Sequence, residues 1–300
     1  MSHRPLRALS LIALIALFLS SATGQEAHGP TVFVQSYVWR NPDKAFGGFS
    51  GIELDARGQD MVVLSDRATL WRGRILRDAA GRIASVQTSG PVALHSSEGK
   101  RLGGDAGDSE GLAMTPEGRV FVSFERLSRI VFYPIDGGPA VRLPRYEAFR
   151  HLPPNDALEA LAIGPDRALY TLPEGDVTHV GQTPIWRFKE GVWTQPFMIS
   201  REGRWKPVGA DFGPDGRFYL LERDFRGLFG FASRVRVFTI RGDRISAGAV
   251  LLETPPGRHD NLEGIAVWRD QSGAIRLTMI SDDNFFPLQR TEIVEYALRR

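Results

Sequence analysis

One short pattern recurs five times along the chain and limits the folds that the chain can adopt. Each copy has an apolar run, a polar turn and a second apolar run that ends in or near an acidic residue. Aligned on the residue before a Gly or Ala, the copies start at Ser50, Glu110, Glu159, Val208 and Glu263, which are 60, 49, 49 and 55 residues apart. This period suits the four-stranded blade of a β-propeller, usually about 40–50 residues long.

The turns and outer runs favour the same architecture. Pro116-Glu117-Gly118 and Pro214-Asp215-Gly216 are typical of tight turns between paired strands. The last copy has only three strands, and an unassigned apolar run at residues 31–39 can supply the fourth. We therefore predict an all-β fold, a β-propeller of five visible four-stranded blades whose ring is closed by the N-terminal strand. A sixth, degenerate blade stays open, and an open β-sandwich is the alternative fold.

The first residues resemble an export signal. Arg4 and Arg7 precede an apolar run at residues 11–19, and Ala22-Thr23-Gly24 offers small residues for cleavage. An uncleaved anchor is the alternative, although the apolar run is shorter than the about 20 residues that span a bilayer. We predict a signal peptide at 1–24, a linker and closing strand at 25–45, one propeller domain at 46–300, and a periplasmic or secreted protein.

Charge narrows the range of partners. The formal net charge is +2, and the predicted signal carries two arginines and no acid, so the rest of the chain is neutral. Nucleic-acid binding therefore lacks its electrostatic basis. No other segment is apolar enough to span a membrane, so we expect no membrane partner after signal cleavage. We expect a monomer that acts on a small anionic or ester substrate.

Acidic residues at the strand ends indicate a binding site. In an antiparallel hairpin the start of the first strand and the end of the second lie at the same edge, so these acids share one mouth of the ring. Crowded carboxylates are costly unless cations offset their repulsion, and Ca²⁺ binds about 6–8 oxygen ligands. The predicted ligands are Glu110, Glu159, Glu263, Asp282 and Asp283. Asp66, Asp108, Glu125, Glu174 and Glu222 are expected at the same mouth.

Arginine is the other source of positive charge. Arg67, Arg126 and Arg223 each follow an acid at equivalent places in three copies. We predict that they bind the anionic part of the substrate, and pairing with the neighbouring acids is the structural alternative. His259 precedes Glu263 by four residues, and we predict that the two are catalytic, since a base beside a metal-bound water assists its attack. A loop histidine in solvent is the alternative.

Several segments together resemble a known family. These are Phe46-Gly47-Gly48-Phe49-Ser50-Gly51, the Glu-Gly-Leu-Ala and Asn-Leu-Glu-Gly-Ile-Ala starts, Leu220-Leu221-Glu222-Arg223-Asp224 and Ser281-Asp282-Asp283-Asn284-Phe285. They resemble the bacterial phytase-like domain, whose members are often labelled "esterase-like activity of phytase" proteins. The resemblance covers about residues 46–298. It implies an exported propeller related in architecture to calcium-dependent alkaline phytases, in which the mouth of the ring binds several Ca²⁺ ions and the substrate phosphate.

Three functions are consistent with these features. The first is a metal-dependent, Ca²⁺-using hydrolase of phosphate or carboxylate esters at the acidic mouth. The second is a non-catalytic propeller of the cell envelope that binds a ligand or partner there. The third is a lactonase-like enzyme with one metal ion. No P-loop, HExxH, dinucleotide or G-x-S-x-G pattern points to another chemistry.

Overall fold

The computed structural model describes residues 28–134 and 139–299. The predicted signal, residues 1–24, lies outside this part. The described strands form five four-stranded antiparallel sheets, one per sequence copy, which we number as blades in chain order. Blade 1 contains β2 (Phe49–Leu54), β3 (Asp60–Ser65), β4 (Thr69–Arg77) and β5 (Ile83–Ala93). Blade 2 contains β6 (Ser109–Met114), β7 (Val120–Phe124), β8 (Arg129–Tyr133) and β9 (Val141–Arg142).

The other three blades follow the same order from the ring axis outward. Blade 3 contains β10 (Leu158–Ile163), β11 (Leu169–Pro173), β12 (Gln182–Lys189) and β13 (Val192–Ser200). Blade 4 contains β14 (Lys206–Phe212), β15 (Phe218–Phe225), β16 (Phe231–Phe238) and β19 (Ala249–Glu253), with β17 (Ile240–Arg241) and β18 (Arg244–Ile245) as a small separate hairpin. Blade 5 contains β20 (Asn261–Arg269), β21 (Ile275–Asp282), β22 (Glu292–Leu298) and β1 (Thr31–Val38).

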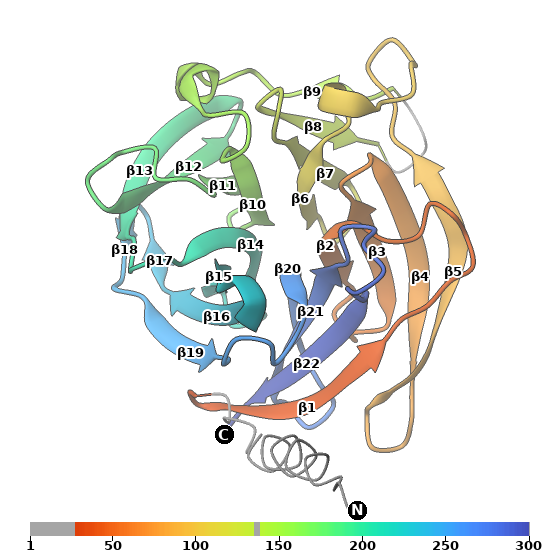
Figure 1. The fold of residues 1–300 in the computed structure, drawn as a ribbon. Helices are drawn as coiled ribbons and strands as arrows, with labels where there is room; N and C mark the ends of the chain where they lie inside the picture. The colour runs from red at the N-terminus through yellow and green to blue at the C-terminus, as the bar shows by residue number, and fades with distance from the viewer. Residues whose placement is uncertain (1–27, 135–138, 300) are drawn as a thin grey trace, which may run out of the picture.

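The sheets stand around a central axis, as Figure 1 shows. The predicted five-bladed propeller and its closure are confirmed: β1 pairs with β22 from Thr31↔Leu298 to Val38↔Glu292, so the first and last strands share one blade. The helical elements in the described part are three short 3-10 helices, Gly104–Ala106, Glu147–His151 and Gly227–Phe229. None of the helices described there is long and apolar enough to cross a membrane.

Each innermost strand has a β-bulge at the residue on which the copies align. The pairing register shifts around Ser50, Glu110, Glu159, Val208 and Glu263. A bulge adds a residue to one strand and turns its side chain away from the regular alternation. A Gly follows four of the five bulges because the inner strands lie very close together. A Cβ on Gly111 would lie 2.5 Å from the carbonyl oxygen of Glu159, and one on Gly264 would lie 2.8 Å from the amide nitrogen of Ile52.

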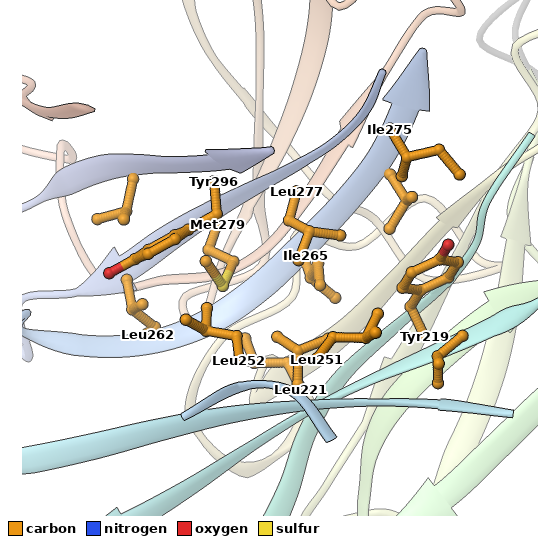
Figure 2. Packing of buried hydrophobic residues seen from close by; sticks show 14 of the residues in the cluster. Tyr219, Leu221, Leu251, Leu252, Leu262, Ile265, Ile275, Leu277, Met279 and Tyr296 are labelled. Atoms are coloured by element: carbon orange, nitrogen blue, oxygen red, sulfur yellow. The ribbon is translucent and has the colours of Figure 1, made fainter. Parts of the chain in front are cut away.

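The hydrophobic core is divided among the five interfaces between neighbouring blades. Five clusters of buried side chains each join residues of two adjacent sheets. Figure 2 shows the cluster between blades 4 and 5, in which Tyr219 and Leu221 pack against Ile265, Leu277 and Met279. Apolar residues on both faces of the inner strands therefore hold every blade to two neighbours, and the ring depends on all five interfaces.

Buried ion pairs reinforce the joint at which the ring closes. Glu295 of β22 is fully buried and accepts hydrogen bonds from both terminal nitrogens of Arg77 in blade 1, at 2.9 and 2.7 Å. It also accepts bonds from Arg276 and Thr278 of its own blade, both at 3.0 Å. One carboxylate thus links blade 5 to blade 1.

We expect Glu295→Ala to lower the free energy of unfolding by about 3–5 kcal/mol, because it leaves two arginines without their buried partner. Urea unfolding measures the change. Glu117→Ala is the matched control, since Glu117 also pairs across a blade boundary, with Arg167 at 2.7 Å, but both side chains are at least half exposed. This control should cost at most about 1 kcal/mol. Equal losses in the two variants would contradict the assignment.

Candidate functional site

Bulges and strand ends together bring carboxylates from four blades to one mouth of the ring. Glu110, Glu159 and Glu263 lie at equivalent bulges in blades 2, 3 and 5. The acids that close the second strands lie at the same edge, as the pairing of Asn261 with Asp282 shows. We call this set the acidic mouth, and it consists of Asp66, Asp108, Glu110, Glu125, Glu159, Glu174, Glu263 and Asp282. The three predicted bulge ligands are thus brought together.

Three of these carboxylates have the spacing of a metal site. Asp108, Glu110 and Glu125 each offer one oxygen, and the three oxygens lie within 4.8 Å of one another. The backbone N–H of Glu125 donates to the carbonyl of Asp108 at 2.9 Å, which fixes the ends of β6 and β7 beside each other. Glu110 was predicted as a ligand, while Asp108 and Glu125 were expected only at the same mouth. The signal of Glu125 in the sequence is the repeat itself, in which an acid follows the second strand, whereas Asp108 immediately precedes the first strand of its blade.

The pKa values of the acidic mouth are raised because its carboxyl groups are buried close to one another. Burial, then the charges of Glu159 and Glu263, raise the pKa of Glu110 well above its usual value. Burial raises the pKa of Glu125 to about 7. Burial and the charge of Glu263 raise the pKa of Asp282 to about 8. Full ionisation near neutral pH therefore requires added positive charge, which favours a bound cation.

Basic side chains offset only one half of the acidic mouth. Arg223 of blade 4 forms ion pairs with Glu263 and, at 2.9 Å, with Glu174. Lys206 lies 2.9 Å from both Glu174 and Asp156. In the described part of the chain, no lysine or arginine forms an ion pair with Glu110, Glu125 or Glu159. Asp66 and Asp282 likewise form no ion pair with a described lysine or arginine, and the three-oxygen group lies on blade 2, away from Arg223 and Lys206 of blade 4.

The two consecutive aspartates of blade 5 have different environments. Asp282 is buried near Glu263 and Asp66, and one of its oxygens accepts a hydrogen bond from the N–H of Asn284 at 2.6 Å. Asp283 instead accepts bonds from the N–H groups of Gly48 and Phe285, at 2.9 and 3.1 Å, and from the Thr291 hydroxyl at 2.9 Å. Its carboxylate fixes a loop, so Asp283 is not among the ligands that we propose.

The three predicted substrate-binding arginines also differ. Arg223 is held by Glu263, Glu174 and Asn261. Arg67 is exposed, and its guanidinium carbon lies 3.2 Å from the centre of the Phe285 ring. Arg126 is exposed and pairs with Asp108 at 3.3 Å. All three lie at the mouth edge, and their role toward a substrate stays a prediction.

Two further residues do not face the acidic mouth as the sequence led us to expect. Glu222 lies on the opposite side of β15 from Arg223, where it is buried against Arg234 and Arg236 at 2.7–2.8 Å. His259 is also buried, and its Nε2 lies 2.8 Å from the Tyr296 hydroxyl. Burial, with the nearby charges of Arg258 and Arg290, lowers the pKa of His259 to about 4. These contacts fit a packing role, and its catalytic role stays a prediction.

A pocket opens beside the compensated half. It has a volume of about 560 Å³ and is lined by basic, aromatic and amide side chains: Arg204, Lys206, Arg223, Phe225, Phe231, Asn261 and Asn284, together with Glu174. Three cationic groups against one carboxylate make its lining favourable for an anionic group. The mouth therefore has carboxylates without an ion pair on blade 2 and a basic pocket lining on blade 4.

A separate pair of acids lies at the other end of the central channel. Glu53 of β2 accepts a hydrogen bond from the N–H of Met114 at 3.0 Å, and Asp211 of β14 accepts one from the N–H of Val267 at 2.6 Å. Both acids line a cavity of about 480 Å³. Burial raises the pKa of Asp211 to about 7, and burial together with the Asp211 charge raises the pKa of Glu53.

The Asp211 shift predicts a pH dependence of stability. A carboxyl whose pKa is higher in the folded than in the unfolded chain makes the protein less stable as pH rises from the unfolded to the folded value. From about pH 5 to about pH 8, the wild type should lose on the order of 2 kcal/mol more than Asp211→Asn. Urea unfolding at both pH values measures the difference. Parallel pH dependences would contradict the shift, whatever the absolute stability of the variant.

Known proteins resemble the chain at two levels. Among curated proteins none matches significantly. Similar solved structures include a streptogramin B lyase, with 13% identity over 90% of this chain and 74% of that chain and a TM-score of 0.43. A gluconolactonase of Xanthomonas campestris has 17% identity over 83% of this chain and 72% of that chain, with a TM-score of 0.45. A virginiamycin B lyase of Staphylococcus aureus has 14% identity over 91% of this chain and 100% of that chain, with a TM-score of 0.43. These values are too low to transfer an activity.

The sequence match is more specific. A family model described as "Phytase-like: Esterase-like activity of phytase" matches residues 44–285, which include the inner strands of all five blades and nearly the whole acidic mouth. The chain belongs to the phytase-like family.

Proposed function

We propose that the protein is a hydrolase of anionic phosphate or carboxylate esters that depends on a divalent cation, with Ca²⁺ as the expected ion. The observation that carries the proposal is the group of Asp108, Glu110 and Glu125, whose oxygens lie within 4.8 Å of one another and include two carboxylates without an ion-pair partner. Membership of the phytase-like family supports a hydrolase.

The donor set fits a hard cation. Carboxylate oxygens are the ligands that Ca²⁺ prefers, and the raised pKa values of Glu110 and Glu125 show that their charges lack compensation. Asp108, Glu110 and Glu125 would hold the ion, with Glu159 as a neighbouring oxygen donor. A bound divalent ion supplies positive charge that polarises an ester and lowers the pKa of a coordinated water.

The chain's own basic residues would orient the substrate. Lys206 and Arg204 line the pocket on blade 4 with exposed or half-exposed side chains, so their nitrogens can reach a ligand. Arg223 is held in place by Glu174 and Glu263, and it adds a fixed positive charge to the same pocket lining. We infer that this pocket receives an anionic group of the substrate while its ester lies toward blade 2. Export to the periplasm or medium remains a prediction from residues 1–24.

The cation requirement is tested by binding and by turnover. Calorimetry should show Ca²⁺ binding that weakens at least about tenfold in Glu110→Gln and Glu125→Gln, because each removes one charged ligand. Hydrolysis of p-nitrophenyl phosphate or p-nitrophenyl acetate should stop with chelator and return with Ca²⁺. Glu117→Gln, an exposed acid in a turn at the other mouth, should change neither measurement.

The outcomes separate the alternatives. Turnover that is unaffected by chelator and by both variants would overturn the proposal. Ca²⁺ binding without turnover of either ester would favour the non-catalytic binding propeller. Opening of a lactone with a single bound ion would favour the lactonase-like enzyme.

The pocket on blade 4 gives a second prediction. The measurement compares kcat/KM for two esters, the p-nitrophenyl monoester of succinic acid and p-nitrophenyl acetate. Lys206→Gln should lower the ratio of the first value to the second about tenfold, because only the first ester carries a carboxylate that a lysine can bind. Lys189→Gln is the matched control, since Lys189 has similar exposure and also pairs with an aspartate, but on β12 at the other edge. An unchanged ratio in Lys206→Gln would exclude this pocket as the anionic subsite.

A further inference from the structure

The connections around the acidic mouth carry an unusual set of exposed apolar side chains. Each blade joins its second and third strands at this mouth, and in four of the five blades that connection bears a large apolar residue in solvent. Leu228 is fully exposed, and Leu288, Phe229 and Val180 are 85%, 77% and 72% exposed. They are the four most exposed large apolar side chains among the described residues. Phe286 and Leu127 add to the set at about half exposure.

Their positions follow from the topology. Phe225 pairs with Phe231, so the 3-10 helix Gly227–Phe229 forms the tip of the β15–β16 hairpin. Leu288 lies between Asp282 at the end of β21 and Glu292 at the start of β22. Leu127 and Val180 occupy the same connection in blades 2 and 3. We call the group Leu127, Val180, Leu228, Phe229, Phe286 and Leu288 the apolar rim.

The exposed charged side chains of these connections are mostly basic. They comprise four exposed arginines and one exposed aspartate, Asp176. The arginines are Arg67, Arg126, Arg226 and Arg290. Three of the arginines pair with acids that are set deeper. For example, Arg226 is 47% exposed and lies 2.7 Å from Asp224, which is 2% exposed. The outermost charges of these connections are therefore mostly positive, although the acidic mouth below them is negative and the exposed Asp105 lies 4.0 Å from Arg126.

We propose that the apolar rim docks onto the surface of an anionic phospholipid bilayer and places the mouth of the ring against it. Separate apolar tips on independent loops around an open ring suit a fluid surface, into which each tip can insert by itself. Arginines between the tips complement anionic headgroups. A stable protein partner would instead have to match tips that stand on four different blades.

This proposal differs from the expectation that the chain has no membrane partner after signal cleavage. That expectation rested on the lack of a long apolar run, and it concerned segments that span a bilayer. Apolar residues at loop tips leave no such run, because the apolar stretches there are very short: Val180 lies between His179 and Gly181, and Leu228-Phe229 lies between Gly227 and Gly230. The docking does not depend on the chemistry at the mouth, and vesicle binding is measured without turnover.

The test is co-sedimentation with vesicles. The protein should bind vesicles of equal parts phosphatidylcholine and phosphatidylglycerol more tightly than vesicles of phosphatidylcholine alone. The double variant Leu228→Ser and Phe229→Ser should weaken binding at least about tenfold, because it removes two apolar side chains that would pass from water into the bilayer. Val192→Ser is the control: Val192 is 61% exposed on the hairpin at the other mouth, and its loss should change binding by less than about twofold.

Every variant carries the same N-terminus, so any contribution of residues 1–24 is common to all of them. Unchanged thermal unfolding would show that the variants fold. Equal binding of the wild type and the double variant, or no binding to either vesicle, would overturn the proposal. A dimer in solution that the double variant converts to a monomer would also overturn it, and would identify the rim as an interface between two copies of this chain.

Discussion

The close approach of the five inner strands around the ring axis determines most of what the molecule can do. At this distance a Cβ on Gly111 or Gly264 would collide with backbone of the next blade, so the position after each bulge is small. In blades 2, 3 and 5 the residue at the bulge before it is a glutamate, which the bulge turns out of the regular alternation of the strand. Acids at three of these positions are therefore crowded by ring closure itself, and their repulsion is inherent in the architecture rather than an accident of surface charge.

Blade 4 differs from the others, and this difference divides the mouth. At its bulge Val208 stands where blades 2, 3 and 5 have glutamate, and from the neighbouring strand Arg223 reaches Glu263 and Glu174. In the strand register Arg223 stands where blades 2, 3 and 5 have a second acid, so blade 4 lacks two acids and gains one arginine, a difference of three charges. Arg223 thereby compensates Glu174 and Glu263, whereas Glu110 and Glu125 of blade 2 depend on protons or a cation. A polar ester could span these two environments, with its anionic end on the basic side.

The repeat in the sequence was sufficient to predict the ring, its five visible blades and its closure, because hydrophobic spacing and turn residues are local properties, but it left a sixth blade open. It also predicted which strand ends share a mouth. It did not predict which side of a strand an acid faces. Glu222 and Arg223 are adjacent and so point to opposite faces of β15, and only the pairing of Glu222 with Arg234 and Arg236 shows which one faces the mouth. Likewise, no local pattern shows that His259 is buried against Tyr296.

In blades 2, 4 and 5 the connection at the mouth combines a buried acid, an exposed arginine and an exposed apolar residue, and this order links the two proposals. In blade 2 a buried Glu125 is followed by an exposed Arg126 and an exposed Leu127. In blade 5 the buried Asp282 leads through the loop to Phe286, Leu288 and Arg290, all exposed. Acids that gather positive charge thus lie deepest, arginines lie above them, and apolar tips lie outermost. A surface that bound the tips would face the open ring, and an ester held at that surface would be delivered to the acids below.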